Sequence, residues 1–377
     1  MTLRIFLTGD NHIGLKYTGH VKSKILKEAR LQAFERMVDE ANRENCSLFV
    51  IAGDLFENTY GILKGDIKTL LSMLSAFHGT VVVLPGNHDY YDLDTALWKE
   101  FRKQMSGCDN ILLLNEYRPY PLELGNQSVV LYPAHCTSIH SAPGENNLGW
   151  IKELDIPRDN TFRIGLAHGA VEGETIDNEG AYFQMSRAEL QHLNMDAWLI
   201  GHTHVPFPKE LQEKYTAVEQ PIFNAGTHVQ RDVHNNTEGL CFIIDIDSDK
   251  KVHARKFISG DLRFCRRTVT VEAGKMEAML REALKDVPDR TVAEIELRGA
   301  VPREEYENRQ AIADGVMSRF LEADVSDYGL SKLISKELIE SEFPETSFSA
   351  GLLTALLQEP KEAQMAYELM KSLKESK

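Results

Sequence analysis

The chain has 377 residues, of which 42% are hydrophobic and 26% charged, and its formal net charge is −15. This composition is that of a soluble globular protein with room for more than one domain, and no apolar run is long enough to span a membrane. The charge argues against a general binder of polyanions. It does not exclude an enzyme that acts on nucleic acid, because bound cations and local basic patches can dominate a site.

The N-terminus and the cysteines both indicate a cytoplasmic protein. The opening MTLRIFLTGD lacks the basic region, long apolar core and cleavage site of a signal peptide. The five cysteines are scattered, odd in number and without a CxxC pair. Such usage is typical of reduced thiols that serve as small core residues.

Short apolar runs alternate with amphipathic segments through the first two-thirds of the chain. The runs are rich in β-branched residues, and they are separated by helices early in the chain and by turns later, which favours an α/β sandwich of packed sheets. We predict strands at 3–8, 47–53, 80–86, 162–169, 197–204, 221–227, 240–246 and 252–258, and helices at 25–42 and 67–77.

The pattern changes near Phe264. Alternating strands at 267–273 and 291–299 enclose a helix at 275–284, and a longer helix is predicted at 303–321. This arrangement predicts a small α+β unit. The chain then ends in two amphipathic helices, at 348–357 and, after a break at Pro360, at 362–373.

Polar side chains follow five of the predicted strands, always at the same end. They are Asp10 and His12 after the first strand, Asp54 and Glu57 after the second, Asn87, His88 and Asp89 after the third, then His168, and finally His202 and His204. In open α/β folds, sites assemble at the carboxyl ends of strands. We therefore expect these groups to meet.

Each of these pieces has an ordinary structural explanation when it is taken alone. Asp-x-His and GNHD are common turns, GD often caps a helix, and a lone histidine is usually a hydrogen-bonded core residue. The His-x-His pair is a better metal signal, because on a strand both rings would lie on one face. Five such pieces in order are not explained by turns, and they predict a metal site.

The expected ligands are carboxylate, amide and imidazole, with no thiolate, and there are too many for one catalytic zinc. They suit two divalent ions that share a bridging carboxylate, the usual device for cleaving phosphoesters. Mn²⁺ is the expected metal, with Mg²⁺, Fe²⁺ and Zn²⁺ as alternatives.

The motif order resembles that of the calcineurin-like metallophosphoesterases. DNHIG, GDLFE, GNHDY and GHTHVPF are more narrowly similar to the SbcD-type DNA repair exonucleases. The resemblance implies a sandwich of two mixed β-sheets flanked by helices, with a small C-terminal α+β capping domain. It divides the chain into a catalytic domain (1–261), a capping or DNA-binding domain (262–340) and a C-terminal helical segment that could dock a partner (341–377).

The resemblance also implies roles for the motif residues. One ion would be held by Asp10, His12 and His204, the other by Asn87, His168 and His202, and Asp54 would bridge them. His88 matches the family's catalytic histidine, which is not a ligand and protonates the leaving oxygen.

Two acidic residues lie beside these motifs. Glu57 stands where related phosphatases have an aspartate that orients the catalytic histidine, and its carboxylate could hold the His88 ring. The alternative is a solvent-exposed loop residue. Asp89 is expected to brace its turn rather than to contact substrate.

The expected activity is a metal-dependent DNA nuclease, a 3′-5′ exonuclease with endonuclease activity in DNA repair. A phosphatase or nucleotide phosphodiesterase that acts on small molecules is the alternative. Basic residues that could contact DNA phosphates, or alternatively lie on solvated faces, are Lys22, Lys24, Lys27, Arg30, Arg263, Arg266 and Arg267.

Partners are expected as well. The chain has no G-x-x-x-x-G-K-[ST] motif, so the SMC-like (SbcC-type) ATPase that the resemblance implies would be a separate subunit. The resemblance also implies a homodimer through two apolar stripes, although these could instead pack on their own sheet: Leu70, Leu71 and Leu74, then Leu97, Trp98 and Phe101. The two C-terminal helices could dock the ATPase or could pack on their own domain.

Overall fold

The computed structural model describes residues 2–173, 181–234 and 237–375. The chain forms two compact units, Met1–Arg263 and Phe264–Lys377. Among the described residues, no helix is both long enough and apolar enough to cross a membrane.

The first unit contains a seven-stranded mixed sheet in the order β4-β3-β2-β1-β11-β12-β9. Strands β1 to β4 are mutually parallel, and β11 and β12 continue the sheet in antiparallel fashion. The strands are β1 (Leu3–Thr8), β2 (Leu48–Ala52), β3 (Thr80–Leu84), β4 (Ile111–Leu113), β9 (Thr216–Val218), β11 (Leu240–Ile246) and β12 (Val252–Ile258).

A second, five-stranded sheet has the order β10-β8-β7-β6-β5. Its strands run parallel except for β5, which pairs antiparallel with β6. The strands are β5 (Tyr120–Leu124), β6 (Gln127–Ala134), β7 (Phe162–His168), β8 (Ala197–Gly201) and β10 (Ile222–Asn224).

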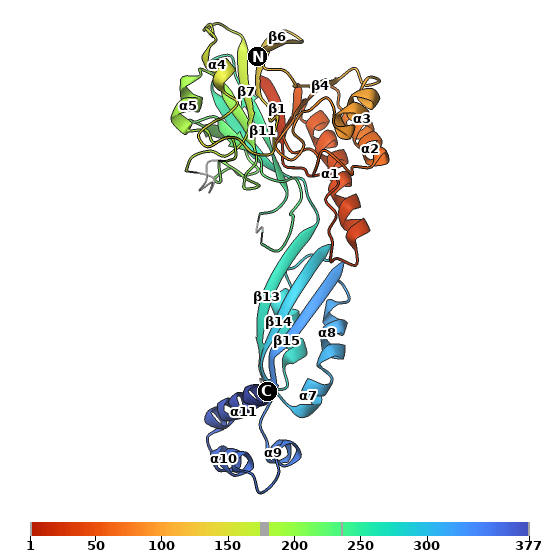
Figure 1. Ribbon diagram of the computed structural model, residues 1–377, viewed down its shortest axis with the longest axis vertical. Coiled ribbons are helices and arrows are strands. Elements are labelled where there is room, and N and C mark those ends of the chain that lie inside the picture. Colours follow the sequence, from red (N-terminus) through yellow and green to blue (C-terminus); the bar gives the residue numbers. More distant parts are fainter. Residues whose placement is uncertain (1, 174–180, 235–236, 376–377) are drawn as a thin grey trace. The chain divides into compact units, whose positions relative to one another are not determined.

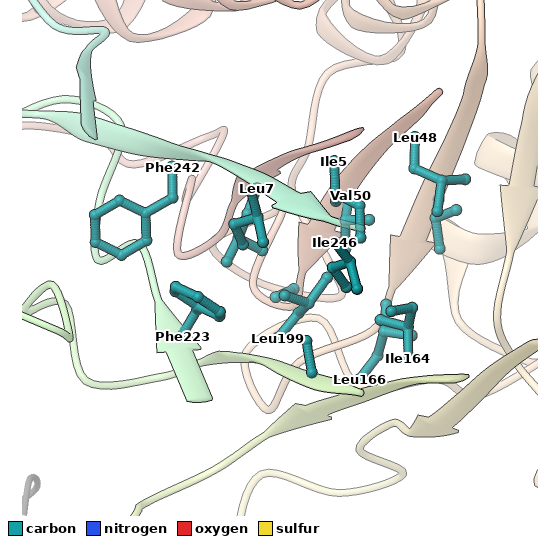
Figure 2. Packing of buried hydrophobic residues seen from close by; sticks show 14 of the residues in the cluster. Ile5, Leu7, Leu48, Val50, Ile164, Leu166, Leu199, Phe223, Phe242 and Ile246 are labelled. Atoms are coloured by element: carbon teal, nitrogen blue, oxygen red, sulfur yellow. The ribbon is translucent and has the colours of Figure 1, made fainter. Parts of the chain in front are cut away.

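The main core lies between these two sheets. Side chains alternate faces along a strand, so Ile5 and Leu7 of β1 face the second sheet while Phe6 between them faces the other way. Figure 2 shows Ile5, Leu7 and neighbours on the first sheet opposite Ile164 and Leu166 of the second. This packing holds the carboxyl ends of both sets of parallel strands together.

Helices cover the outer faces of the sandwich, as Figure 1 shows. One group packs on the outer face of the first sheet through residues such as Phe34, Leu70 and Trp98. Leu148 and Leu190 pack on the second. The helices are α1 (Ser23–Arg43), α2 (Lys64–Ser75) and α3 (Ala96–Met105) on the first sheet, and α4 (Gly149–Lys152) and α5 (Arg187–His192) on the second.

The second unit is a three-stranded sheet in the order β13-β14-β15 with its own apolar core. Helices α6 and α8 contribute Leu280 and Val316 to that core. The elements are β13 (Arg263–Val271), α6 (Met276–Leu284), β14 (Thr291–Val301), α7 (Arg303–Glu307), α8 (Arg309–Met317) and β15 (Glu322–Lys332).

Three helices end the chain: α9 (Lys336–Glu342), α10 (Phe348–Leu356) and α11 (Pro360–Glu375). They share a small core that includes Phe343, Leu353 and Tyr367. Gln364 accepts a hydrogen bond from the Ile334 amide (2.8 Å), which ties α11 to the residues just after β15. The C-terminal stripes are therefore partly buried within their own unit.

The expected α/β sandwich of two mixed sheets with a smaller α+β unit is the observed fold. Several local predictions were wrong or incomplete, and strands β4, β5, β6 and β9 were not predicted. The strand expected at 197–204 ends at Gly201, and the helix expected at 303–321 is divided at Asn308 into α7 and α8. Strand β15 was not predicted, because it is largely exposed and lacks an apolar alternation.

The six apolar residues on which we based the homodimer are all at most 3% exposed and lie in the subunit's own core. The alternative explanation, packing on their own sheet, is thus the correct one for these side chains. Dimerisation itself stays a prediction, and it would need another surface.

Gly165 of β7 provides a test of the packing on the second sheet. A Cβ added there would lie 2.4 Å from Cε3 of Trp198, whose indole is fixed by a 2.8 Å hydrogen bond to the Leu190 carbonyl. We expect Gly165→Ala to lower the free energy of unfolding by about 1–3 kcal/mol, as overpacked cores do. Chemical denaturation measures this free energy of unfolding.

Gly149→Ala is the matched control, because no atom lies within 4 Å of an added Cβ. It should leave stability unchanged or raise it slightly, since alanine reduces the entropy of the unfolded chain. Equal stabilities for the two variants would contradict the packing described here.

Candidate metal centre

The expected side chains lie at the carboxyl ends of β1, β2, β3, β7 and β8. The first three strands belong to one sheet and the last two to the other. Apolar packing between the sheets brings these ends together, so loops far apart in sequence form one cluster. Of its members, Asp10, His12, Asp54, Asn87 and His168 are each at most 3% exposed.

Several of these residues have a left-handed backbone. The φ angles are 47° for Asp10, 46° for His12, 50° for Asp54, 121° for His202 and 55° for His204. Side chains other than glycine rarely adopt such angles, and clusters of them are typical of functional sites.

Backbone hydrogen bonds hold this conformation. The Asp10 amide donates to the Gly53 carbonyl (3.1 Å), and the His12 amide donates to the Asp54 carbonyl (2.9 Å). The loops after β1 and β2 are thereby joined. Both Asp10 carboxylate oxygens accept from the His202 amide (2.9 and 3.0 Å), which links the two sheets.

Two glycines permit the close approach of these loops. A Cβ on Gly53, whose φ is 91°, would lie 2.0 Å from Nδ1 of His168, and a Cβ on Gly201 would lie 2.1 Å from the Ala52 carbonyl oxygen. The glycines that precede Asp54 and His202 therefore have a steric reason.

The first group of candidate ligands is Asp10, His12, Asp54 and His204. One ligand atom from each lies within 4.8 Å of all the others. The Nε2 atoms of His12 and His204 face each other at 2.9 Å. Two imidazoles so directed are arranged as they would be around a common cation.

The second group consists of Asn87, His168 and His202. Asn87 Oδ1 lies 3.0 Å from His168 Nε2 and 3.2 Å from His202 Nδ1. His168 Nδ1 lies 2.9 Å from the Ala52 carbonyl oxygen. Because a carbonyl can only accept, that nitrogen carries the proton, and Nε2 is left to bind a cation.

Asp54 stands between the two groups. Its Oδ2 lies 3.3 Å from His168 Nε2 and 3.8 Å from His12 Nε2, is buried, and has no hydrogen bond. Its Oδ1 is fixed by the His88 amide at 2.8 Å. A buried carboxylate oxygen without a hydrogen bond is costly unless a cation compensates it, so the residues present fit two ions with Asp54 in common.

The protonation of the buried groups supports this fit. Burial, together with the charge of Asp54, raises the pKa of Asp10 to about 7, although His168 opposes the shift. Burial lowers the pKa of His168, but the Asp54 carboxylate outweighs it and raises that pKa to about 9. A dication bound at Nε2 would compete with a proton at that nitrogen.

His88 and Glu57 contact each other in a way that differs from the expectation. His88 Nδ1 lies 3.0 Å from the Glu57 backbone carbonyl oxygen, not from its carboxylate. The carboxylate oxygen Oε2 lies instead 2.9 Å from Nδ1 of His12. The local backbone places the carbonyl toward His88, so Glu57 orients that ring through its main chain.

Asp89 braces the turn, as expected. Its side chain is fully buried and accepts from the amides of Gly86 (2.6 Å) and Phe56 (3.0 Å). The Trp98 indole donates to the Asp89 carbonyl (2.9 Å). Asp89 therefore positions Asn87 and His88 from behind.

The reasoning about His-x-His was wrong in detail. Both histidines follow β8 rather than lying on it, so their rings do not share a strand face. His202 faces Asn87, whereas His204 faces His12. The turn divides the pair between the two groups.

Two nearby residues were missed. Arg231 Nη1 lies 3.5 Å from His204 Nδ1, and no sequence signal marked it. His135 follows β6, which is parallel to β7, and its ring stacks on Tyr117 at 4.3 Å. Recognising β6 as a strand would have indicated a sixth strand end with a polar residue, His135, at this edge.

Several of the basic residues proposed to contact DNA are engaged within the protein. Arg30 is 1% exposed and donates to the Asn11 carbonyl. Arg263 donates to the Gly260 carbonyl, and Arg266 pairs with Glu294. Arg30 was therefore wrongly expected to lie on the surface.

Comparisons with known proteins agree on the class of site. The family model described as calcineurin-like phosphoesterase matches residues 3–206. An uncharacterized metallophosphoesterase of Bacillus subtilis (strain 168), YhaO, is 24% identical over 232 residues, which are 59% of this chain and 53% of that protein. The chain thus spans about half the length of this relative.

Solved structures with a similar fold include TT1561 of Thermus thermophilus (TM-score 0.41, 12% identity, covering 69% of this chain and all of that one). A dimetal phosphatase from Danio rerio has a TM-score of 0.36 and 11% identity, covering 68% of this chain and 98% of that one.

The matched family region is more than half of the chain and contains every side chain of both ligand groups. Because the match and the converging side chains coincide, this chain belongs to the calcineurin-like phosphoesterase family.

Proposed function

We propose that this metallophosphoesterase is a DNA nuclease of the SbcD type, a 3′-5′ exonuclease with endonuclease activity that acts in DNA repair. Metal-dependent phosphoester hydrolysis is supported by one observation. Asp54 Oδ2 lies between the two ligand groups, is buried and has no hydrogen bond. The DNA specificity is supported by the resemblance of the motifs DNHIG and GDLFE. It is also supported by the additional α+β unit, which a minimal small-substrate enzyme does not need.

The chain's own residues suggest how the reaction would proceed. Two dications held by the ligand groups would neutralise a phosphodiester's charge and lower the pKa of the attacking water. The Glu57 carbonyl accepts from His88 Nδ1–H. Nε2 therefore faces away from that contact, and when the ring is doubly protonated its Nε2–H could donate the proton that the leaving oxygen needs.

A nucleotide phosphodiesterase for small substrates is the second candidate. The observation that favours it is the loss of expected DNA contacts, since Arg30 is buried and Arg266 is paired with Glu294. The net charge of −15 points the same way.

A substrate comparison distinguishes the two candidates. With Mn²⁺ present, we expect the protein to degrade labelled linear duplex DNA from its 3′ ends and to cleave a chromogenic phosphodiester. Chelation should abolish both activities. Cleavage of the chromogenic ester with no action on duplex or single-stranded DNA would reject the nuclease and favour the small-substrate enzyme.

His88 and Asp54 should differ when each is substituted. His88→Ala should retain both metals, because His88 is not a proposed ligand, yet reduce kcat by about 10²–10⁴-fold, the usual contribution of a general acid. Asp54→Asn should lower metal content and activity together, because the shared negative charge is lost. Elemental analysis and steady-state kinetics measure the two effects.

The pair of variants serves as its own control. Loss of metal from His88→Ala would mean that His88 is a ligand. A fully loaded and active Asp54→Asn would overturn the arrangement with two ions.

The proposed SMC-like ATPase partner would dock on the exposed side of the C-terminal helices. Met365, Leu369 and Leu373 recur every four residues on α11 and are 60–71% exposed. Nearby in sequence, Phe348 at the start of α10 is 81% exposed. An apolar helix face of this kind suits a groove in another protein.

Leu369→Glu tests this docking face. It should abolish co-purification with the SbcC-type ATPase and leave hydrolysis of the chromogenic ester unchanged, because the ligand groups all precede residue 205. Lys361→Glu, at an exposed position on the same helix, is the control for added negative charge. Retained ATPase binding by Leu369→Glu, with an unchanged thermal melt, would place the interface elsewhere.

A further inference from the structure

A cavity of about 330 Å³ lies beside the metal centre. Ile13 and Gly14 line one side of it, and α1 and the start of α2 line the rest. Gly14 is two residues beyond the candidate ligand His12, so their Cα atoms are at most about 8 Å apart. The cavity therefore lies beside the loop that carries His12, and none of its lining residues is a candidate ligand.

Arg30 lies in the wall of this cavity and is a buried cation without a carboxylate partner. It is 1% exposed, and no ion pair to it is found in the described part of the chain. Its Nη1 donates to the Asn11 carbonyl (2.6 Å) and its Nε to the Tyr17 hydroxyl (3.1 Å), while Nη2 has no hydrogen bond. Buried charges are seldom left uncompensated, so an anion is expected close by.

Lysines add positive charge to the cavity wall. Lys27, one turn before Arg30 on α1, is exposed, lines the cavity and makes no ion pair among the described residues. Lys24 also lines it and lies 3.8 Å from Glu28, so those two charges offset each other.

Two acidic residues line the cavity, Glu28 and Asp66. Glu28 is offset by Lys24, so the opposing charge is that of Asp66 in the first turn of α2. Its carboxylate is partly compensated there, because backbone N–H groups at a helix N-terminus carry positive partial charge. The free positive groups, Arg30 and Lys27, outnumber it.

We propose that this cavity binds a second phosphate of the substrate, one that is not cleaved and lies next to the phosphate at the metal centre. The proposal deepens the proposed nuclease function and rests on it, because each nucleotide of a DNA strand brings such a neighbouring phosphate. Lys27 would contact it directly, and Arg30 would supply the field from the cavity wall. The cavity would thus favour a polynucleotide over an isolated phosphodiester.

The test is a binding measurement with two probes that differ by one phosphate. Calorimetry in the presence of Mn²⁺ compares thymidine 3′,5′-bisphosphate with thymidine 5′-monophosphate. For the wild type, we expect the bisphosphate to bind about tenfold more tightly, in keeping with one additional charged contact. Lys27→Gln should remove most of that difference and leave monophosphate binding unchanged.

Asp66→Asn should have the opposite effect and increase the preference for the bisphosphate, because it removes the opposing charge. Lys68→Gln, an exposed residue of α2 that does not line the cavity, should match the wild type. Arg30 is left intact because it also holds Asn11 and Tyr17. Thermal melts establish that each variant is folded.

The possible outcomes distinguish a failure of the subsite proposal from a failure of the nuclease proposal. If the wild type binds both probes equally, or if Lys27→Gln keeps the full preference, the cavity is not a phosphate subsite, whatever the protein does to DNA. If the preference is present and lost in Lys27→Gln, the subsite exists, even where duplex DNA is not degraded.

Discussion

The loops and side chains of the candidate metal centre are arranged around a single buried carboxylate, that of Asp54. One of its oxygens is fixed by a backbone amide, and the other lies between His12 and His168 with no hydrogen bond. Such an oxygen is stable only beside positive charge. The Asp54 carboxylate raises the pKa of His168, and divalent cations held by the two ligand groups would supply positive charge at this oxygen. The flanking loops, their left-handed residues and the glycines beneath them all serve to position this group.

Apolar packing between the two sheets stabilises these loops in their strained conformation. The alternating faces of β1 and β7 bury a continuous core between the sheets, and this core holds strained loops that would not be stable alone. Backbone hydrogen bonds from Asp10 to Gly53 and from His12 to Asp54 then fix the loops against each other. Precise placement of side chains on rigid strand ends is what metal-assisted chemistry requires.

The basic residues near the centre have two different roles. Arg30 is used inside the protein, where it supports Asn11 between two candidate ligands. Lys27, one helical turn away, faces the adjoining cavity. Positive charge is therefore concentrated beside the centre, although the whole chain is acidic. A net charge of −15 is thus compatible with local positive charge beside the site.

The sequence by itself determined the most apolar strands of the sandwich and most of the polar residues at their ends, but not β4, β5, β6 and β9. Apolar runs such as LRIFLT and LCFIIDI have the length of buried strands, and their ends are marked by glycine and aspartate. Such patterns can be recognised from neighbouring residues in the sequence alone. The tertiary structure alone decided which of these groups meet, because pairing across two sheets depends on packing rather than on spacing. It placed the Glu57 carbonyl, not its carboxylate, at His88. It buried Arg30 and the leucines of α2, and it brought His135 and Arg231 to the same edge. Those outcomes follow from contacts between residues far apart in the chain, on which a local pattern carries no information.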